Sequence, residues 1–288
     1  MLKLAVLSLV ILIAATVHAQ TQPAFEAEKM IPPANPALPT IWIIGDSTVH
    51  NSTPPLVGWG DVIGQWFDTS RINIVNRAIP GRSSRSFINE GHWTEVLDQM
   101  KPGDYLLMQF GHNDESVVNE PPDAKSPRSR GTIPGIGDES VDIVNTVTHK
   151  PETVHTFGYY MRKYVSEAKA KNVKVMVCSY VPRLPKKFTP TTQPAAHSLW
   201  AKQIADEQGA TFLDIRSLVW KYWAQFDVKD IKEKYFPKDG THTNADGAAI
   251  HASAVTAAIR ADKSNPLNGY LRDSAPQHVG PTTKPSDQ

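Results

Sequence analysis

The chain has one cysteine, Cys178, among its 288 residues. An intrachain disulfide is therefore impossible, and a buried apolar core must stabilise the fold. Cys178 ends the apolar run VMVC, which is typical of a buried strand, where a thiol behaves as a small apolar side chain. We do not expect a catalytic role for it.

The chain also lacks an excess of charge of either sign. It has 30 Lys and Arg residues, 29 Asp and Glu residues, and no dense basic block. Such a chain has no net field to attract a polyanion. We therefore expect no nucleic acid among its partners.

Long hydrophobic runs are missing after the first residues. The run from Leu4 to Val17 follows Lys3 and is succeeded by small residues at Ala19, as in a secretory signal peptide. It is too short for a comfortable membrane span, and no cysteine follows it directly to carry a lipid. We expect cleavage near Ala19, no membrane anchor, and a secreted or periplasmic protein.

The remaining chain divides by composition. Residues 20–38 are rich in proline and predict an extended lead-in, and residues 263–288 predict a loose polar tail. Between them, residues 39–262 are long enough for one large domain with a sizeable core.

Within that domain, short apolar runs alternate with segments of helical periodicity. The expected strands are 41–44, 72–79, 104–110, 173–180 and 210–215. The expected helices are 59–67, 93–100, 152–171, 197–208, 216–226 and 245–261, the last capped by Asn244. This alternation predicts an α/β fold with three layers, α/β/α, around a five-stranded parallel sheet. Glu115 to Val141 is a long loop with little apolar pattern, which is typical of a functional or mobile segment.

Small polar residues follow the first three strands. Ser47 follows the first strand in TIWIIGDSTV, Gly81 the second, and Asn113 the third. Each is an ordinary turn residue by itself. Because ligands bind outside the carboxyl ends of parallel strands, we expect the three to share one edge of the sheet.

Nucleophilic catalysis by serine needs a base, a group that orients the base, and donors for the oxyanion. Asp239 and His242 lie three residues apart just before the last helix and supply the base and its partner. The Gly81 backbone and the Asn113 amide are suitable donors.

At this point the chain resembles the SGNH or GDSL-type hydrolases. Their four blocks appear as GDST with Ser47, NRAIPGRSSRSF with Gly81, GHND with Asn113, and DGTH with Asp239 and His242. The resemblance implies a flavodoxin-like fold, a nucleophilic Ser47, His242 as base and Asp239 as its orienter. It also implies an oxyanion hole formed by Ser47, Gly81 and Asn113, and no cofactor or metal.

Within that family the chain is most similar to the bacterial rhamnogalacturonan acetylesterases, which remove acetyl groups from the pectin backbone. The segments that carry this likeness are IIGDSTV, GWGDVIGQWF, GRSSRSF, QFGHND and YFPKDGTHTNADG. Gly240 departs from a histidine found in some members, and the cysteines of fungal relatives are missing. The partner expected is an acetylated plant cell-wall polysaccharide, bound by a monomer.

Pectin carries carboxylates, so Arg82 and Arg85, next to the glycine block, are candidate substrate contacts, together with His112. Salt bridges at helix ends or in loops are an equally good interpretation of the two arginines.

Other functions remain open at the level of sequence. They are an esterase acting on another acetylated polysaccharide such as xylan, a retired hydrolase that only binds polysaccharide, and a lipase or thioesterase, although no long apolar lid is present. The α/β-hydrolases are disfavoured because their G-x-S-x-G elbow is absent: Val49 stands two residues after Ser47. Metal-dependent hydrolysis is disfavoured because His112, Asp114, Asp239 and His242 form no recognised ligand motif.

Overall fold

The computed structural model describes residues 33–125, 128–188 and 195–280. The predicted signal peptide and most of the predicted lead-in lie outside these residues. In the described part, no helix has the length and apolar character needed to cross a membrane.

A five-stranded parallel sheet forms the centre of the domain, with strand order β2-β1-β3-β6-β7. Its strands are β1 (Thr40–Gly45), β2 (Asn73–Asn76), β3 (Tyr105–Gln109), β6 (Lys174–Cys178) and β7 (Thr211–Leu213). Every residue of β1 is buried, because β1 lies between β2 and β3 and is covered on both faces. The predicted parallel sheet is confirmed.

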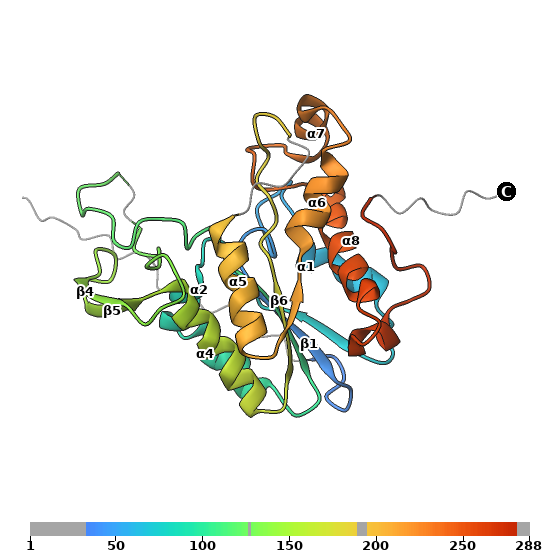
Figure 1. Ribbon diagram of the computed structural model, residues 1–288, viewed down its shortest axis with the longest axis horizontal. Helices are drawn as coiled ribbons and strands as arrows, with labels where there is room; N and C mark the ends of the chain where they lie inside the picture. Colours follow the sequence, from blue (N-terminus) through green and yellow to red (C-terminus); the bar gives the residue numbers. More distant parts are fainter. Residues whose placement is uncertain (1–32, 126–127, 189–194, 281–288) are drawn as a thin grey trace, which may run out of the picture. The chain divides into compact units, whose positions relative to one another are not determined.

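Alternate residues of β1 pack into two separate cores. Ile41 and Ile43 face one core, and Trp42 and Ile44 face the other, as the two-residue period of a strand requires. Helices cover both faces of the sheet (Figure 1). The first core is closed by α1 (Trp59–Val62), the 3-10 helix η1 (Ile63–Trp66), α6 (Ile215–Trp223), α7 (Val228–Tyr235) and α8 (Ala245–Ala261). The second is closed by α2 (Ser84–Asn89), α3 (His92–Gln99), α4 (Phe157–Ala170) and α5 (Ala196–Glu207).

The helix predicted over residues 152–171 is wrong at its start. Residues Pro151–His155 form strand β5, which pairs antiparallel with β4 (Ser140–Val144), and α4 begins only at Phe157. Thr156 caps α4 by accepting a hydrogen bond from the Tyr159 N–H. Val154 is buried as predicted, but in a strand rather than on a helix.

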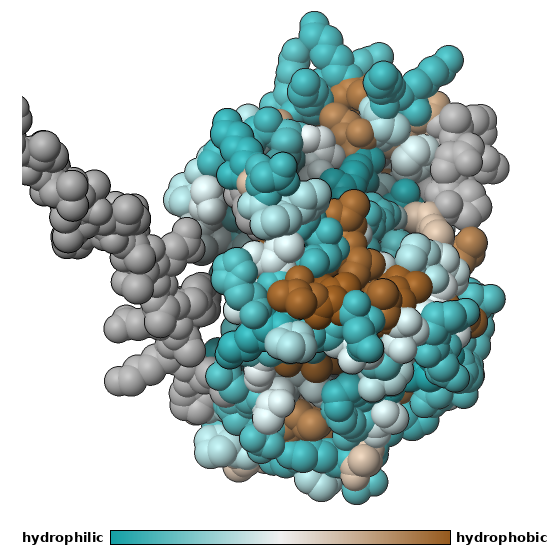
Figure 2. Space-filling view, turned by 90° about the vertical axis from the view of Figure 1, so that its left-hand side faces the viewer, coloured by the Kyte–Doolittle hydropathy of each residue, from teal (hydrophilic) through white to brown (hydrophobic). Residues whose placement is uncertain are grey.

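Only the first two residues of the β4–β5 hairpin, Ser140 and Val141, fall inside the segment predicted to be a loop. Three valines of the hairpin, Val141, Val144 and Val147, are exposed. The hairpin lies on the side of the molecule shown in Figure 2, where apolar side chains gather among mostly hydrophilic ones.

The prediction of a loose tail after Asp262 is also wrong for residues 263–280. This segment contains the 3-10 helix η2 (Pro266–Tyr270), and Leu267 is fully buried in the first core. The Arg272 guanidinium donates a hydrogen bond to the carbonyl oxygen of Phe67, across 2.8 Å. The segment is therefore part of the domain.

Candidate active site

Ser47 lies in a tight turn at the carboxyl end of β1. A side chain at Gly45 would bring a Cβ atom within 2.6 Å of the carbonyl oxygen of Gln109, so the turn needs glycine there. The Asp46 carboxylate accepts hydrogen bonds of 2.8 Å from both the backbone N–H and the hydroxyl of Thr48. This local network fixes the backbone on both sides of Ser47 and leaves the serine side chain partly exposed.

The serine hydroxyl meets a histidine from the other end of the domain. Ser47 Oγ lies 2.8 Å from Nε2 of His242, and Nδ1 of His242 lies 2.8 Å from Oδ2 of Asp239. Since the carboxylate can only accept, Nδ1–H donates to it, and Nε2 is left to accept the serine proton. The arrangement has the order and spacing of a serine, histidine and aspartate triad.

One turn before α8 supplies both the imidazole and the carboxylate. Asp239 Oδ1 accepts from the backbone N–H groups of Thr241 and His242, at 2.7 and 2.8 Å. Partial burial opposes its ionisation, but these bonds and the one from the His242 ring lower the pKa of Asp239 below its ordinary value. The carboxylate is therefore charged throughout the neutral range.

Two of the predicted oxyanion donors follow the strands that flank β1. Gly81 follows β2, and Asn113 follows β3. Gly81 has a φ of +80°, a conformation that favours glycine. Asn113 Nδ2 donates to the carbonyl oxygen of Arg82 across 2.9 Å, which ties the third block to the second. Within the described residues, neither the Ser47 nor the Gly81 backbone N–H donates a hydrogen bond.

Comparison with known proteins identifies the family of this site. The model of the GDSL-like lipase/acylhydrolase family matches residues 43–250, which include all of the residues above. The chain belongs to this family. It is therefore a carboxylic ester hydrolase.

Two curated relatives have named activities. A rhamnogalacturonan acetylesterase of Emericella nidulans is 33% identical over 222 residues, 76% of this chain and 84% of that protein. The rhamnogalacturonan acetylesterase RhgT of Bacillus subtilis is 30% identical over 205 residues, 62% of this chain and 87% of that protein.

Solved structures show the same fold. The crystal structure of YxiM from Bacillus subtilis aligns with a TM-score of 0.61 at 22% identity, over 79% of this chain and 58% of that one. An acetylxylan esterase from Geobacillus stearothermophilus aligns with a TM-score of 0.50 at 17% identity, over 78% of this chain and 94% of that one.

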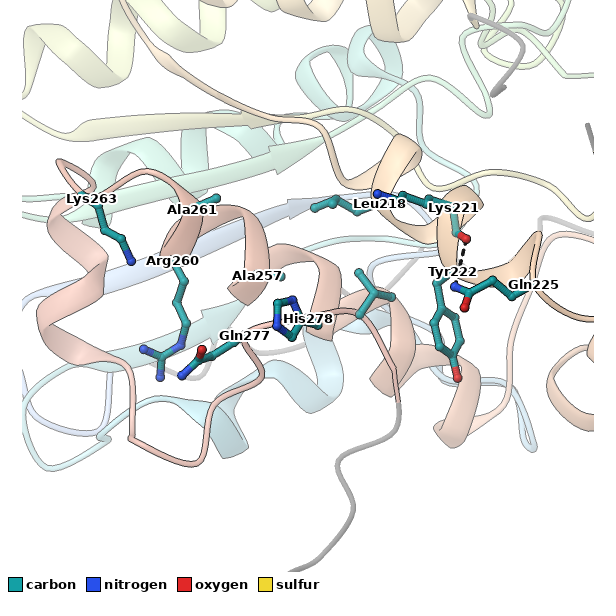
Figure 3. Close-up of a pocket in the computed structure, with 11 residues that line it drawn as sticks. Leu218, Lys221, Tyr222, Gln225, Ala257, Arg260, Ala261, Lys263, Gln277 and His278 are labelled. Carbon is teal, nitrogen blue, oxygen red and sulfur yellow. Dashed lines mark hydrogen bonds between the residues drawn. The ribbon is translucent and has the colours of Figure 1, made fainter. Parts of the chain in front are cut away.

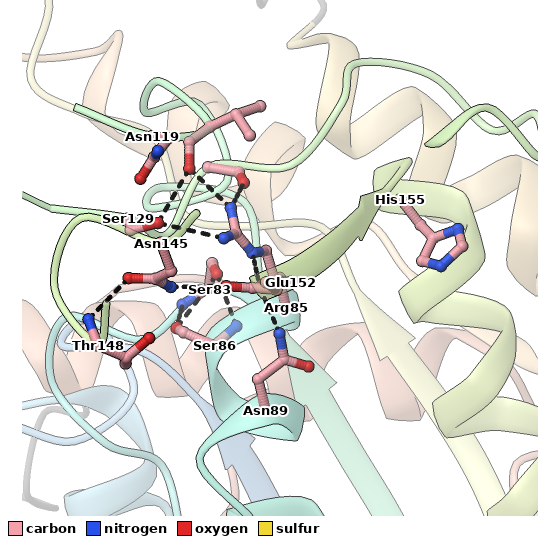
Figure 4. A network of polar contacts seen from close by, with 12 residues as sticks. Ser83, Arg85, Ser86, Asn89, Asn119, Ser129, Asn145, Thr148, Glu152 and His155 are labelled. Carbon is pink, nitrogen blue, oxygen red and sulfur yellow. Dashed lines mark hydrogen bonds and ion pairs between the residues drawn. The ribbon is translucent and has the colours of Figure 1, made fainter. Parts of the chain in front are cut away.

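In this GDSL-family hydrolase, the side chain of Arg85 is almost fully buried, which corrects its prediction as a substrate contact. Its guanidinium donates to Glu152 across 2.5 Å, to the carbonyl oxygens of Val118 and Gly131 across 2.7 Å, and to the Ser129 hydroxyl (Figure 4). Arg85 therefore holds the segment between β3 and α4 against α2.

His112 does not present its ring to the surface either. The side chain is buried, and its ring packs edge-on against Tyr180 with the centroids 4.6 Å apart. Burial, and then the charges of Arg183 and Arg216, hold the pKa of His112 well below its ordinary value. The ring is therefore neutral and packed against Tyr180, and its prediction as a substrate contact stays a prediction. Arg82, by contrast, keeps a partly exposed side chain, which pairs with Glu90.

Arg183, which was not predicted from the sequence, links two of the loops that carry candidate site residues. Its guanidinium donates to the hydroxyl of Thr241 and to the carbonyl oxygen of His112, both across 3.1 Å. Arg183 follows β6 at the same edge of the sheet as Ser47 and Asn113. The rule that polar residues after parallel strands form the site, extended to the fourth strand, would have found it.

Some other features of the hydrolase lie outside this site. Among the described residues, no three His, Cys, Asp or Glu side chains are grouped so that they can hold a metal ion. A cavity of about 590 Å³ lies between α6, α8 and the segment after η2 (Figure 3). Its lining includes Lys221, Arg260 and His278 but none of the triad.

Proposed function

We propose that this hydrolase removes acetyl groups from the rhamnogalacturonan backbone of pectin through an acetyl-enzyme intermediate on Ser47. The observation that carries the proposal is the 2.8 Å contact between Ser47 Oγ and His242 Nε2, joined to Asp239 by a second contact of 2.8 Å. The substrate is supported by the named activities of the two curated relatives.

In the first half of the reaction, His242 takes the proton of Ser47 as the hydroxyl attacks the acetyl carbonyl. The developing oxyanion is stabilised by the Ser47 and Gly81 backbone N–H groups and by the Asn113 amide. The Asn113 amide has two N–H groups, so one remains for the oxyanion while the other donates to Arg82. The protonated imidazole then gives its proton to the departing sugar oxygen.

In the second half, water replaces the sugar. His242 takes a proton from the water molecule, the resulting hydroxide attacks the acetyl-serine, and acetate leaves as Ser47 recovers its proton. Asp239 holds the imidazole in the required tautomer and stabilises the imidazolium in both halves. Its lowered pKa keeps it ionised for this role.

An esterase for another acetylated polysaccharide such as xylan is the second candidate. The likeness to an acetylxylan esterase, at 17% identity, extends to the fold alone. A protein that only binds polysaccharide is disfavoured, since binding alone needs no hydrogen-bonded serine, histidine and aspartate.

Acetate release from a matched panel tests the proposal. The panel contains acetylated rhamnogalacturonan, acetylated xylan and 4-nitrophenyl acetate, and Ser47→Ala protein serves as the blank. We expect the highest kcat/KM on rhamnogalacturonan. A higher value on xylan would transfer the assignment to the second candidate, and binding of polymer without acetate release would make the protein a binding module.

A further inference from the structure

A cavity of about 780 Å³ opens beside the predicted oxyanion hole. It lies between α2 and residues 128–153, and Gly81 is part of its wall. Because Gly81 is one of the proposed oxyanion donors, a sugar chain whose acetyl group reaches Ser47 can extend into this cavity. The cavity is therefore placed to bind a sugar next to the acetylated one.

The lining of the cavity has more positive than negative side chains. Its basic residues are Arg82, Arg85, Arg128, Arg130 and Lys150, and its acidic residues are Glu90 and Glu152. Both acidic residues are already paired, Glu90 with Arg82 at 2.7 Å and Glu152 with Arg85 at 2.5 Å.

Three basic side chains of the lining are left after these two ion pairs. Within the described part of the chain, Arg128, Arg130 and Lys150 form no ion pair with an acidic side chain. Like charges close together repel one another, and an anion placed among them removes that repulsion.

Arg130 is the member of this group nearest to the proposed catalytic centre. One nitrogen of its guanidinium donates to the carbonyl oxygen of Gly81 across 3.0 Å, and its Nε reaches the Ser116 hydroxyl at 3.4 Å. Burial, and then the charge of Arg128, lower the pKa of Arg130. Three of its five N–H donors are left over, enough for a bidentate contact with a carboxylate.

We propose that Arg130, Arg128 and Lys150 form a subsite for the carboxylate of a uronic acid residue in the polysaccharide chain that carries the acetyl group. The inference rests on the proposed function and extends it to the charge of the polysaccharide chain beside the ester. The buried pair of Arg85 and Glu152 supports the subsite from behind by fixing the segment that carries Arg130 (Figure 4). An acidic backbone such as rhamnogalacturonan fits this subsite, and a neutral xylan main chain does not.

The test compares one polymer in two charge states. Acetylated rhamnogalacturonan is used with free carboxylates and after methyl esterification of those carboxylates, and kcat/KM is measured on both. We expect the ratio of acidic to neutral kcat/KM to fall about tenfold in Arg130→Gln, a typical loss for a hydrogen bond to a charged group. Arg130→Lys should retain part of the ratio.

Because Arg130 also contacts Gly81, a second variant separates binding from effects on the oxyanion hole. Lys150→Gln removes a charge from the exposed rim of the cavity, and we expect a fall of about threefold in the same ratio. Lys202→Gln removes a charge on α5, where Lys202 pairs with Asp206, and should leave the ratio unchanged. Added salt should lower the wild-type ratio more than that of Arg130→Gln.

Equal ratios in the wild type, Arg130→Gln and Lys150→Gln would overturn the subsite while leaving the proposed function intact. If the wild type releases no acetate from either polymer, the proposed function fails. The subsite is then decided by inhibition of 4-nitrophenyl acetate hydrolysis by galacturonate oligomers. Inhibition that weakens in Arg130→Gln supports the subsite, and an absence of inhibition overturns it.

Discussion

At the scale of single residues, the triad is built largely by local hydrogen bonds. The Asp239 carboxylate accepts from two backbone N–H groups of its own turn as well as from the His242 ring. For this reason the spacing of Asp239 and His242 was readable in the sequence. The positions of Arg130 and Arg183 relative to the site depend on long-range contacts, and no motif marks either residue.

The Asn113 amide should act on the rate of the chemical step. Asn113→Ala should lower kcat by roughly 10²–10³, as loss of a single oxyanion donor does in other enzymes, with little change in KM. Steady-state kinetics on 4-nitrophenyl acetate measure both constants. A change confined to KM would argue for a role in binding instead.

Asp114 should make the stability of the protein depend on pH. Its burial raises its pKa to about 7, against the opposing effect of hydrogen bonds from Ser84. In the unfolded chain the pKa of the group is near the ordinary aspartate value of 3.8. The folded state therefore holds the proton more tightly, and stability falls as pH rises from about 4 to about 7, by at most about 1.4 kcal/mol per pH unit.

Asp114→Asn should remove this dependence, because the amide does not titrate. The quantity to measure, by urea denaturation, is the free energy of unfolding of the variant minus that of the wild type. We expect this difference to increase between pH 5 and pH 8. The exposed Asp273→Asn serves as the control. Parallel profiles for wild type and Asp114→Asn would show that Asp114 does not titrate in this range.

At the scale of elements, agreement between sequence and structure follows how local the determinants are. Helix α8 runs from Ala245 to Ala261 behind its Asn244 cap, as predicted, because both the cap and the apolar pattern are local. Strand β5 was mistaken for the start of a helix because its pairing with β4 is non-local and the burial of Val154 fits both structures. Helix α7, Val228–Tyr235, was not predicted at all, since its charged sequence buries only Ile231 and Tyr235.

Arg85 should stabilise the long segment between β3 and α4. Arg85→Met breaks the buried pair with Glu152, removes the donor to the carbonyl oxygen of Gly131, and leaves that of Val118 with only the longer bond from Ser129. We expect a loss of roughly 3 kcal/mol in the free energy of unfolding, at the lower end for buried pairs because two asparagine amides still donate to Glu152. Urea denaturation measures it.

A matched control is the surface pair of Lys202 and Asp206 on α5. Lys202→Met should cost less than about 1 kcal/mol, as is usual for exposed pairs. If Arg85→Met costs no more than this control, the network in Figure 4 contributes little to holding the segment.

At the scale of the whole molecule, the parallel sheet explains why the site was predictable. Strand order β2-β1-β3 brings Gly81, Ser47 and Asn113 together at one edge. The alternation of strands and helices predicts a parallel sheet, in which every strand has its carboxyl end at that edge. The path of residues 115–125 and 128–150 around that edge was not predictable, because polar contacts such as those of Arg85 hold it rather than an apolar pattern. The same holds for residues 263–280, whose few apolar side chains gave no periodic signal.

Leu267 should show that this last segment belongs to the fold. It is fully buried in the first core. Leu267→Ala should lower the free energy of unfolding by about 2–5 kcal/mol, the usual range for a buried leucine. Val147→Ala, at an exposed position of the hairpin, should change it by less than about 0.5 kcal/mol. Equal effects of the two variants in urea denaturation would contradict the packing described for residues 263–280.

The central claim is that Ser47 attacks the ester with His242 as its base. The most direct measurement is kcat for acetate release by Ser47→Ala, with circular dichroism to show that the variant is folded. The account predicts a loss on the order of 10⁶ in kcat, as for removal of the nucleophile in other serine hydrolases. Acetate release by folded Ser47→Ala at a rate near that of the wild type would contradict it.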